Sequence, residues 1–427
     1  MIEIVKYPQQ EQWQLYARRA AEVDETLRGN VARIIDDVAA RGDKALIEMT
    51  ERFDGCRIDS LKVSEAEIDE ACVQVGEDLR SAIKTAADNI EKFHAAELPA
   101  EVSVEVMPGI NCRQKAVPIS RVGLYIPGGN SPLFSTVLML AIPARLAGCK
   151  EVVLCTPPRR DGTIHPAILY AAREAGVTSI FKVGGAQAVA AMAIGTESIS
   201  PVFKIFGPGN RYVTEAKVQV STRGVAIDMP AGPSEVMVVA DSSANALFVA
   251  SDFLSQAEHG ADSQSILLTT DERLAMAVAD NIDMLLARLP KDELARQSLS
   301  HSHIIVLHDD EEMMQFANYY APEHLIINHA QAERLAMMVE NAGSVFLGAY
   351  SPESVGDYAS GTNHTLPTSG YARCYSGVNI DSFMKKITFQ RLTRDGLASI
   401  APTVTVMAHN EGLVAHSLAV EVRINEQ

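Results

Sequence analysis

The stretch SDFLSQAEHGADSQ, residues 251–264, places two side chains that can bind a metal ion at the end of a predicted helix. Gln256 and His259 are three positions apart, and residues with this spacing lie on one face of a helix. An amide oxygen and an imidazole nitrogen can both coordinate a divalent cation. Taken alone, the pair more often marks a polar last turn with a histidine near the negative end of the helix dipole. A metal site therefore needs further ligands from elsewhere in the chain.

A second candidate group lies in SPESVGDYASGTNH, residues 351–364. In a helical turn, Glu353 and Asp357 would lie four residues apart on one face, where like charges destabilise the helix slightly. A bound cation would reverse that repulsion. The pair alone is also typical of a solvated acidic turn, but the glycines of this stretch, with Asn363 and His364, indicate a tight functional loop.

A candidate proton acceptor lies in APEHLIIN, residues 321–328. Glu323 and His324 stand directly before an apolar strand, and loops next to the strands of parallel sheets often carry chemistry. A histidine accepts a proton near neutral pH, and an adjacent carboxylate can orient or deprotonate water. Neighbouring side chains point in different directions, so the two would act on different atoms. The alternative interpretation is a capped strand edge.

The tail segment AHNEGLVAHSLAV, residues 408–420, contains His409, Glu411 and His416. In a continuous helix, His409 and His416 would lie two turns apart on one face, whereas Glu411 and His416 would be well separated around the axis. This spacing does not decide which of them binds a ligand, and a single histidine here is more often an ordinary surface or core residue. Gln256, His259, Asp357 and a tail histidine are a donor set that a catalytic zinc ion accepts.

Three glycine-rich turns each connect a predicted strand to a predicted helix, in residues 123–137, 183–192 and 206–216. The chain has neither a GxGxxG fingerprint nor a Walker motif. Glycine is common in any turn, but three such turns would line the carboxyl edge of one parallel sheet, where helix N-termini receive a pyrophosphate. Together they predict a dinucleotide site. A fourth turn, DMPAGPSEV, ends at Ser234, which without a GxSxG elbow is expected to be a polar substrate contact or a cap.

The elements that must position these residues follow two α/β series. Residues 23–53 and 64–96 repeat apolar positions at helical spacing, which predicts two long helices on one face of a sheet. From residue 122, short apolar runs alternate with amphipathic segments, and a second alternating series follows from residue 235. This alternation predicts two α/β domains with parallel sheets. The segment from about residue 379 breaks the rhythm and is expected to form an arm.

The composition excludes several classes of protein. The chain has 427 residues, a hydrophobic content of 47% and a net charge of −17, and so acidic a chain without a basic cluster does not favour nucleic acid. No signal peptide or stretch long enough to span a membrane is evident, so a cytoplasmic location is expected. The six cysteines lack CxxC spacing, and their surroundings do not suggest an activated thiolate.

With these stretches in view, the sequence resembles the histidinol dehydrogenases, the enzymes of the last steps of histidine biosynthesis. The resemblance runs almost from end to end. It rests on GLYIPGG, VGGAQA, FGPGN, DMPAGPSEV, SDFLSQAEHG, PEHLII, GSVFLG, SPES, GDYASGTNH and EGLVAH, which occur in matching order.

This resemblance implies a zinc- and NAD-dependent oxidation of L-histidinol, through bound L-histidinaldehyde, to L-histidine in two hydride transfers. It implies that His324 takes the proton of the alcohol and that Glu323 activates the water that attacks the aldehyde. The zinc ligands implied are Gln256, His259, Asp357 and, from the partner subunit of a homodimer, His416. The substrate contacts implied are Ser234, Gln256, His259, His324, Glu353, Asp357, His364, Glu411 and His416, with Glu411 receiving the substrate's ammonium from the partner's arm. The NAD contacts implied are Tyr125, Gln187 and Asn210.

The fold implied is two incomplete Rossmann-like domains with parallel-rich sheets. The expected divisions are an N-terminal extension over 1–22, a first α/β domain over 23–121 and 235–378, a second, NAD-binding α/β domain over 122–234, and a C-terminal arm over 379–427 that is exchanged between the subunits of a dimer.

Two other functions compete with this interpretation. One is a related zinc- and NAD-dependent dehydrogenase acting on a small alcohol that carries an anionic group, which Glu411 disfavours because a carboxylate repels an anion. The other is a catalytically silent metal-binding or regulatory scaffold, which has no need of the Glu323 and His324 pair.

Overall fold

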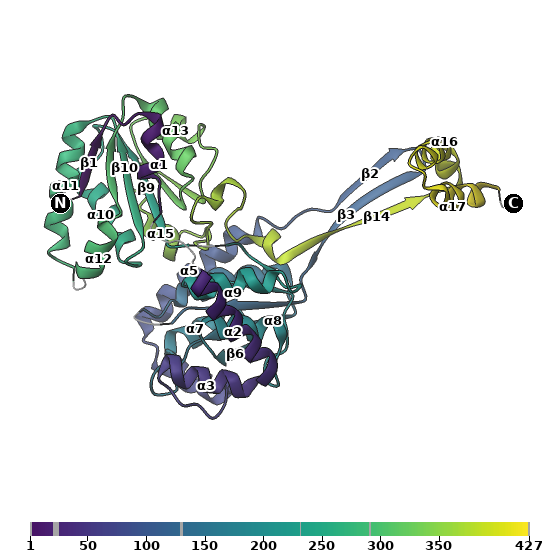
Figure 1. Ribbon diagram of the computed structural model, residues 1–427, viewed down its shortest axis with the longest axis horizontal. Coiled ribbons are helices and arrows are strands. Elements are labelled where there is room, and N and C mark those ends of the chain that lie inside the picture. The colour runs from purple at the N-terminus through teal and green to yellow at the C-terminus, as the bar shows by residue number, and fades with distance from the viewer. Residues whose placement is uncertain (1, 20–24, 129–130, 231, 290–291, 426–427) are drawn as a thin grey trace.

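The computed structural model describes residues 2–19, 25–128, 131–230, 232–289 and 292–425. The chain forms two α/β lobes joined side by side, and a long arm projects from them (Figure 1). The predicted fold class, mixed α/β with parallel-rich sheets, is confirmed. In the part of the chain that the structure describes, no helix is long and apolar enough to cross a membrane.

The first lobe is built on a six-stranded sheet in which every pairing is parallel. Its strands, in spatial order, are β1 (Glu3–Lys6), β11 (His303–Val306), β10 (Gln264–Thr269), β9 (Glu235–Ala240), β12 (His324–Asn328) and β13 (Ser344–Leu347). The central strands are buried along their whole length, because helices cover both faces and near-continuous apolar runs suit that environment. The strands of the second predicted series are therefore confirmed, and β1 from the N-terminal segment joins them.

Alternate residues of these strands contact different helices. One face packs against α10 (Ala246–Ala257), α11 (Glu272–Leu286) and α12 (Asp292–Leu299). The opposite face packs against α1 (Trp13–Tyr16), α13 (Asp310–Tyr320) and α14 (Ala332–Ala336). Short elements complete this part of the chain: η1 (Gln10–Gln12), α15 (Glu353–Tyr358) and η2 (Tyr371–Arg373). A further short element, η3 (Ile380–Phe383), packs in the core of the other lobe.

The second lobe is built on a five-stranded parallel sheet. Its order is β6 (Ser179–Lys182), β5 (Glu151–Thr156), β4 (Arg121–Tyr125), β7 (Lys204–Phe206) and β8 (Ala226–Ile227). The intervening helices are α6 (Phe134–Ala147), α7 (Pro166–Ala175), α8 (Gly185–Ile194) and α9 (Arg211–Ser221). These are the strand and helix positions that the first alternating series predicts.

The N-terminal helices belong to this second lobe, so the expectation that residues 23–121 form part of the first domain is wrong. The expected two long helices are four: α2 (Glu25–Arg41), α3 (Asp43–Asp54), α4 (Glu65–Gln74) and α5 (Glu77–Ala95). Gly42, at φ 54°, separates α2 from α3. The helices also cover both faces of the sheet, because α2 and α3 share a core with α8 and α9, whereas α4 and α5 share one with α6 and α7. Amphipathic spacing identifies a buried face of a helix but not the sheet that covers it.

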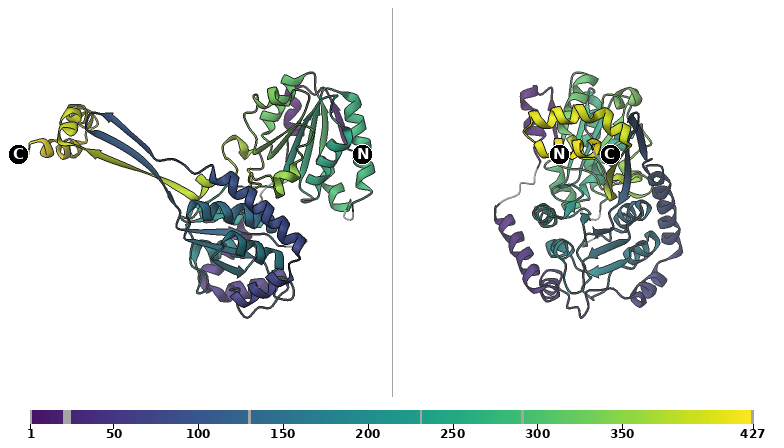
Figure 2. Two further views of the ribbon diagram at one scale, coloured as in Figure 1. Left: turned by 180° about the vertical axis from the view of Figure 1, so that it is seen from behind. Right: turned by 90° about the vertical axis from the view of Figure 1, so that its right-hand side faces the viewer.

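The arm contains strands from two distant parts of the chain. The hairpin of β2 (Val102–Met107) and β3 (Ile110–Pro118) pairs antiparallel with β14 (Met384–Leu392). Two helices, α16 (Arg394–Asn410) and α17 (Val414–Asn425), cap its far end (Figures 1 and 2). An arm is thus present, but its strand begins at Met384 rather than at residue 379, because Ile380 and Phe383 lie in the core of the second lobe. Residues 102–118, which are expected in the first domain, also belong to the arm.

Candidate active site

A cluster of ionisable side chains gathers at the amino ends of β9 and β12 in the first lobe. His324 is the first residue of β12, and Glu323 directly precedes it. α15 brings Glu353 and Asp357 to the same place, four residues apart as predicted. His259 follows the end of α10, and Gln256 lies in the last turn of that helix.

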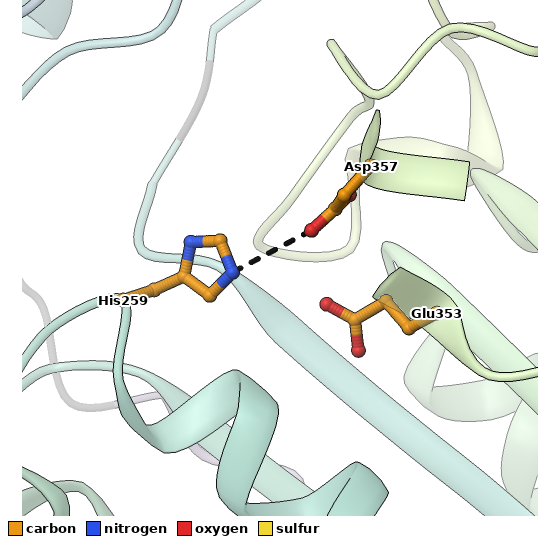
Figure 3. A group of neighbouring side chains, drawn as sticks. All are labelled: His259, Glu353 and Asp357. Atoms are coloured by element: carbon orange, nitrogen blue, oxygen red, sulfur yellow. Dashed lines mark ion pairs between the residues drawn. The ribbon is translucent and has the colours of Figure 1, made fainter. Parts of the chain in front are cut away.

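Three of these side chains could hold a metal ion. One ligand atom from each of His259, Glu353 and Asp357 lies within 4.8 Å of the others (Figure 3). The closest approach between His259 and Asp357 is 3.6 Å, from Nε2 to Oδ2. Burial lowers the pKa of His259, but the Asp357 carboxylate outweighs burial and raises it. A dication could replace the positive charge that this imidazole supplies, since metal ligands bind in their deprotonated forms.

Gln256 supports the same interpretation. Its side chain is fully buried, and neither amide atom has a hydrogen-bond partner among the described residues. A buried amide without partners costs folding free energy, and such groups in native proteins often bind an ion or ligand. The nitrogen and oxygen donors of Gln256, His259 and Asp357 therefore fit a zinc ion that takes its remaining ligands from outside this set.

His324 lies between three carboxylates. Its Nε2 is 3.6 Å from Asp357 Oδ1, and its Nδ1 is 3.6 Å from Glu323 Oε2 and 3.7 Å from Glu353 Oε1. Burial lowers the pKa of His324, but Glu353, Glu323 and Asp357 outweigh burial and raise it to about 10. The imidazole is therefore a strong proton acceptor in this environment.

Two other carboxyl groups of the cluster are buried, and burial raises the pKa of each. The pKa of Glu323 rises to about 8, and its Oε2 accepts a hydrogen bond of 2.8 Å from the amide of Glu235. The pKa of Glu353 also rises, and neither of its oxygens has a hydrogen-bond partner among the described residues. Glu353 can thus accept a hydrogen bond from a ligand that enters the cluster.

His364 connects the two lobes at this point. Its Nδ1 lies 2.8 Å from the carbonyl oxygen of Asp357, so this nitrogen donates, and its Nε2 lies 3.1 Å from the hydroxyl of Thr136 on α6. Ser234 is half-buried directly before β9, and its carbonyl oxygen accepts from the amide of Gln264.

A cavity of about 1430 Å³ opens at the carboxyl edge of the five-stranded sheet. It exceeds the ~300–1000 Å³ of a typical drug-sized pocket, so it is large enough for a dinucleotide. The three glycine-rich turns meet there, and each contributes one predicted contact: Tyr125, Gln187 and Asn210. Ser131 and Pro132, just before α6, line the cavity, and Thr136 one turn later contacts His364. The cavity and the ionisable cluster therefore lie close to each other.

The cavity contacts have defined chemistry. Tyr125 Oη accepts from the amide of Gly185, and burial raises the pKa of Tyr125 to about 12, so the phenol keeps its proton and can donate it in a hydrogen bond. Asn210 is the N-cap of α9, and its Oδ1 accepts from the amides of Tyr212 and Val213. Its amide nitrogen donates to none of the described residues and can bind a ligand.

The structure adds residues that sequence reasoning missed. Asp54 lines the cavity, its Oδ2 has no hydrogen-bond partner among the described residues, and burial raises its pKa to about 6. As the last residue of a helix, it has no distinguishing signal in the sequence. Arg19 and Glu235 were also not predicted as site residues, although the backbone of Glu235 contacts both Glu323 and His324.

The arm residues lie apart from this cluster. Glu411 caps the C-terminus of α16 and His416 belongs to α17, both exposed at the far end of the arm (Figure 2). Because α16 ends at Asn410, His409 and His416 do not share one helix, so the two-turn spacing of a continuous helix does not apply. His409 Nε2 instead lies 3.1 Å from the hydroxyl of Ser417. Within one chain, two of the four implied zinc ligands, His259 and Asp357, are therefore close to each other. Gln256 is in the last turn of the helix just before His259, and His416 lies in the arm.

Comparison with known proteins gives consistent matches over the whole chain. Residues 17–424 match the family model described as histidinol dehydrogenase. A histidinol dehydrogenase of Bacteroides fragilis (strain YCH46) is 56% identical over 425 residues, covering 100% of this chain and 99% of the relative. The crystal structure of histidinol dehydrogenase from Elizabethkingia anophelis matches with a TM-score of 0.97 and 51% identity, covering 99% of this chain and 98% of that chain. An acetylating aldehyde dehydrogenase from Geobacillus thermoglucosidasius has 16% identity and a TM-score of 0.50 over 89% of this chain and 96% of that chain, which shows similarity of fold alone.

Proposed function

The chain belongs to the histidinol dehydrogenase family, and we propose that it converts L-histidinol to L-histidine in two oxidations at one zinc-containing site. Members of this family are NAD-dependent oxidoreductases of histidine biosynthesis, and this chain is one of them. The roles of individual residues given below are part of the proposal.

Zinc would be held by Gln256, His259 and Asp357 of one subunit and by His416 of the partner subunit. When bound, zinc supplies coordination positions for the imidazole and amine of the substrate, which orients the carbinol carbon toward the nicotinamide. The buried, unpartnered amide of Gln256 and the short distance between His259 and Asp357 support this ligand set.

His324 would act as the base of the first oxidation. Its buried Nε2 takes the proton of the alcohol oxygen while a hydride leaves the carbinol carbon for NAD, which yields the aldehyde and NADH. Asp357 is one of the carboxylates that raise the pKa of His324. A cation bound to Asp357 would offset that contribution and lower the pKa of His324, which favours the neutral imidazole that accepts a proton.

Glu323 would act in the second oxidation. In its ionised form it takes a proton from water as the water oxygen adds to the aldehyde carbon. The resulting hydrate gives its hydride to a second NAD, and the acid so formed releases its remaining acidic proton to solvent to leave the carboxylate product. Water is the expected nucleophile because the thiols are poorly activated. Burial raises the pKa of Cys149 to about 12 and also raises that of Cys155, which disfavours a thiolate route.

The remaining polar groups would bind the ends of the substrate and the cofactor. Glu353 is buried and neither of its carboxylate oxygens has a hydrogen-bond partner among the described residues, so it would bind a polar group of the substrate, and Ser234 and His364 would bind others. Glu411 of the partner subunit would receive the ammonium group. Tyr125, Gln187 and Asn210 would contact NAD in the large cavity.

A homodimer with exchanged arms would complete the site. The arm exposes many large apolar side chains, which solvent does not favour on an isolated monomer. They are Val102, Val104, Val106, Met107, Ile387, Phe389, Leu392, Val406, Met407, Leu413, Val414, Leu418 and Val422. A second exposed apolar group lies beside the cluster, at Phe248, Tyr350, Val355 and Tyr358, and is the surface that we expect the partner's arm to cover.

The observation that carries this proposal is the position of His324 within 4 Å of three carboxylates, one of which also contacts His259.

The test is NADH formation from L-histidinol by metal-stripped protein before and after zinc is added, with NADH counted per histidinol consumed. Zinc-restored turnover with about two NADH per substrate supports the two-step reaction. One NADH per substrate would indicate an alcohol dehydrogenase that releases aldehyde. No turnover by the zinc-loaded dimer would redirect the search to small alcohols that carry an anionic group.

A further inference from the structure

We propose that Arg19 and Glu235 form a buried positioning pair that holds Glu323 and His324 in their working orientation. The proposal rests on the roles proposed above for Glu323 and His324. It assigns a function to the N-terminal segment, of which residues 2–19, the part that the structure describes, contribute no side chain to the cluster itself.

Glu235 is in contact with both residues through its backbone. Its amide donates to Glu323 Oε2 at 2.8 Å, and its carbonyl oxygen lies 3.2 Å from His324 Nδ1. A carbonyl oxygen only accepts, so this contact places the proton of a neutral His324 on Nδ1. His324 Nε2 is then left without a proton, as a general base requires.

The position of Glu235 itself depends on Arg19. Arg19 Nε donates to Glu235 Oε1 at 3.0 Å and Nη2 donates to Oε2 at 2.8 Å, so the guanidinium spans the whole carboxylate. The Glu235 side chain is 2% exposed and that of Arg19 is 17% exposed. Bidentate pairs of this kind fix geometry as well as charge, and a buried carboxylate without its partner is strongly unfavourable.

Other contacts hold Arg19 in place. Its Nη2 also donates to the carbonyl oxygen of Tyr320 at 2.8 Å, and the guanidinium lies 3.9 Å from the centroid of the Tyr320 ring. The preceding helix α1 is anchored by Trp13, whose ring meets that of Phe316 edge-on at 5.1 Å. The backbone amide of Ser369 also donates to Glu235 Oε1. Glu235, as the first residue of β9, is therefore fixed by several hydrogen bonds at the point where it contacts the catalytic pair.

The first test replaces Arg19 in the zinc-loaded, full-length dimer. Small displacements of catalytic groups carry large rate penalties, so Arg19→Met is expected to lower kcat at least about 10-fold for both histidinol and histidinaldehyde. The KM for NAD and the zinc content should stay unchanged, because neither the cavity nor the ligand set contains Arg19. Arg19→Lys should give an intermediate kcat, since an ammonium cannot span both carboxylate oxygens.

The matched control is Lys6→Met. Lys6 joins the same N-terminal segment to the same lobe through an ion pair with Glu272 at 2.7 Å, but that pair is exposed. Lys6 also lies at the carboxyl end of the sheet, whereas the cluster lies at the amino ends of β9 and β12. Lys6→Met should leave kcat unchanged. A fall in kcat equal to that of Arg19→Met would show that the segment acts only by general stabilisation, and would overturn the proposal.

Glu235→Gln provides a second route if Arg19→Met does not fold. It keeps the backbone contacts and the shape of the side chain but removes the charge that Arg19 binds. The expected result is a lower kcat, with the Arg19→Met and Glu235→Gln double variant no slower than the worse single variant. Unchanged kcat per zinc-loaded site in these variants overturns the positioning role. If Glu323→Gln and His324→Asn are themselves without effect, the failure lies in the proposed function instead.

Discussion

Lys217 Nζ lies 2.5 Å from Asp228 Oδ1, and both side chains are almost completely buried. Lys217 also donates to the carbonyl oxygen of Gly207, and the Gly207 amide donates to Asp228 Oδ2. Gly207 has φ 123°, and a Cβ there would overlap the carbonyl oxygen of Tyr125. The ion pair thus fixes the turn that carries Asn210 to the cavity.

Removing one member of this pair should destabilise the protein strongly. Lys217→Met leaves the Asp228 carboxylate buried without its counter-ion, which is expected to lower the free energy of unfolding by roughly 3–5 kcal/mol. Urea denaturation of the purified variant measures the change. Lys84→Met, which removes an exposed pair with Asp88, is the control and should leave the unfolding midpoint close to that of the wild type. Equal midpoints for all three proteins would contradict the structural role of the buried pair.

The division of labour between His324 and Glu323 gives a kinetic prediction. His324→Asn should slow both oxidations by about 10²–10⁴-fold, whereas Glu323→Gln should mainly slow oxidation of the aldehyde. Rapid-mixing measurements of NADH formation, started from histidinol or from histidinaldehyde, separate the two steps. Equal losses in both steps for Glu323→Gln would refute the assignment of water activation to Glu323.

The strands could be predicted from the sequence more reliably than the packing partners of the helices. Apolar runs such as EVMVVA form the fully buried β9, because both faces of a parallel sheet are covered. The helices from residue 25 to 95 carry the same kind of pattern whichever sheet they cover, so their lobe could not be inferred. β2 is exposed along its whole length, so its apolar side chains lie outside any core of the single chain. An apolar sequence pattern therefore does not predict burial for this strand.

The candidate site shows the same limit. Glu353 and Asp357 share a helical face, as their spacing predicts, but nothing local relates either residue to His259, almost one hundred positions earlier. Only the resemblance to a family brought those residues together. The contact of Arg19 with Glu235 spans 216 positions. Glu235 lies in DMPAGPSEV, but Arg19 belongs to none of the motifs on which that resemblance rests.

Asp54 provides a prediction about pH. Burial raises its folded pKa to about 6, above the ~3.9 expected in the unfolded chain. Below about pH 4 the carboxyl is protonated in both the folded and the unfolded state. As the pH rises from about 4 to 6, it ionises in the unfolded state while it is still protonated in the folded state, so the free energy of unfolding falls. Because the side chain is only half-buried, Asp54→Asn should stabilise the NAD-free protein by roughly 1–2 kcal/mol at pH 8 and have little effect at pH 4.

Melting temperatures of the two proteins at both pH values test this sign. The exposed Asp59 lies five residues further along the chain, and Asp59→Asn is the control for a change in net charge alone. A stabilisation of Asp54→Asn that is the same at pH 4 and pH 8 would contradict ionisation of a buried carboxyl as its cause.

The exchanged arm predicts complementation between two inactive proteins. His416→Ala removes a ligand that one subunit would give to its partner, and His324→Asn removes a base that each subunit keeps for its own site. A mixed dimer then has one site with both residues intact and one site with neither. If subunits exchange freely, about half of the dimers are mixed and half of their sites are intact, so about a quarter of the wild-type activity should return. The measurement is NADH formation after the two proteins are mixed under conditions that allow exchange. No recovery, despite mixed dimers detected by a tag on one variant, would mean that each subunit completes its own site.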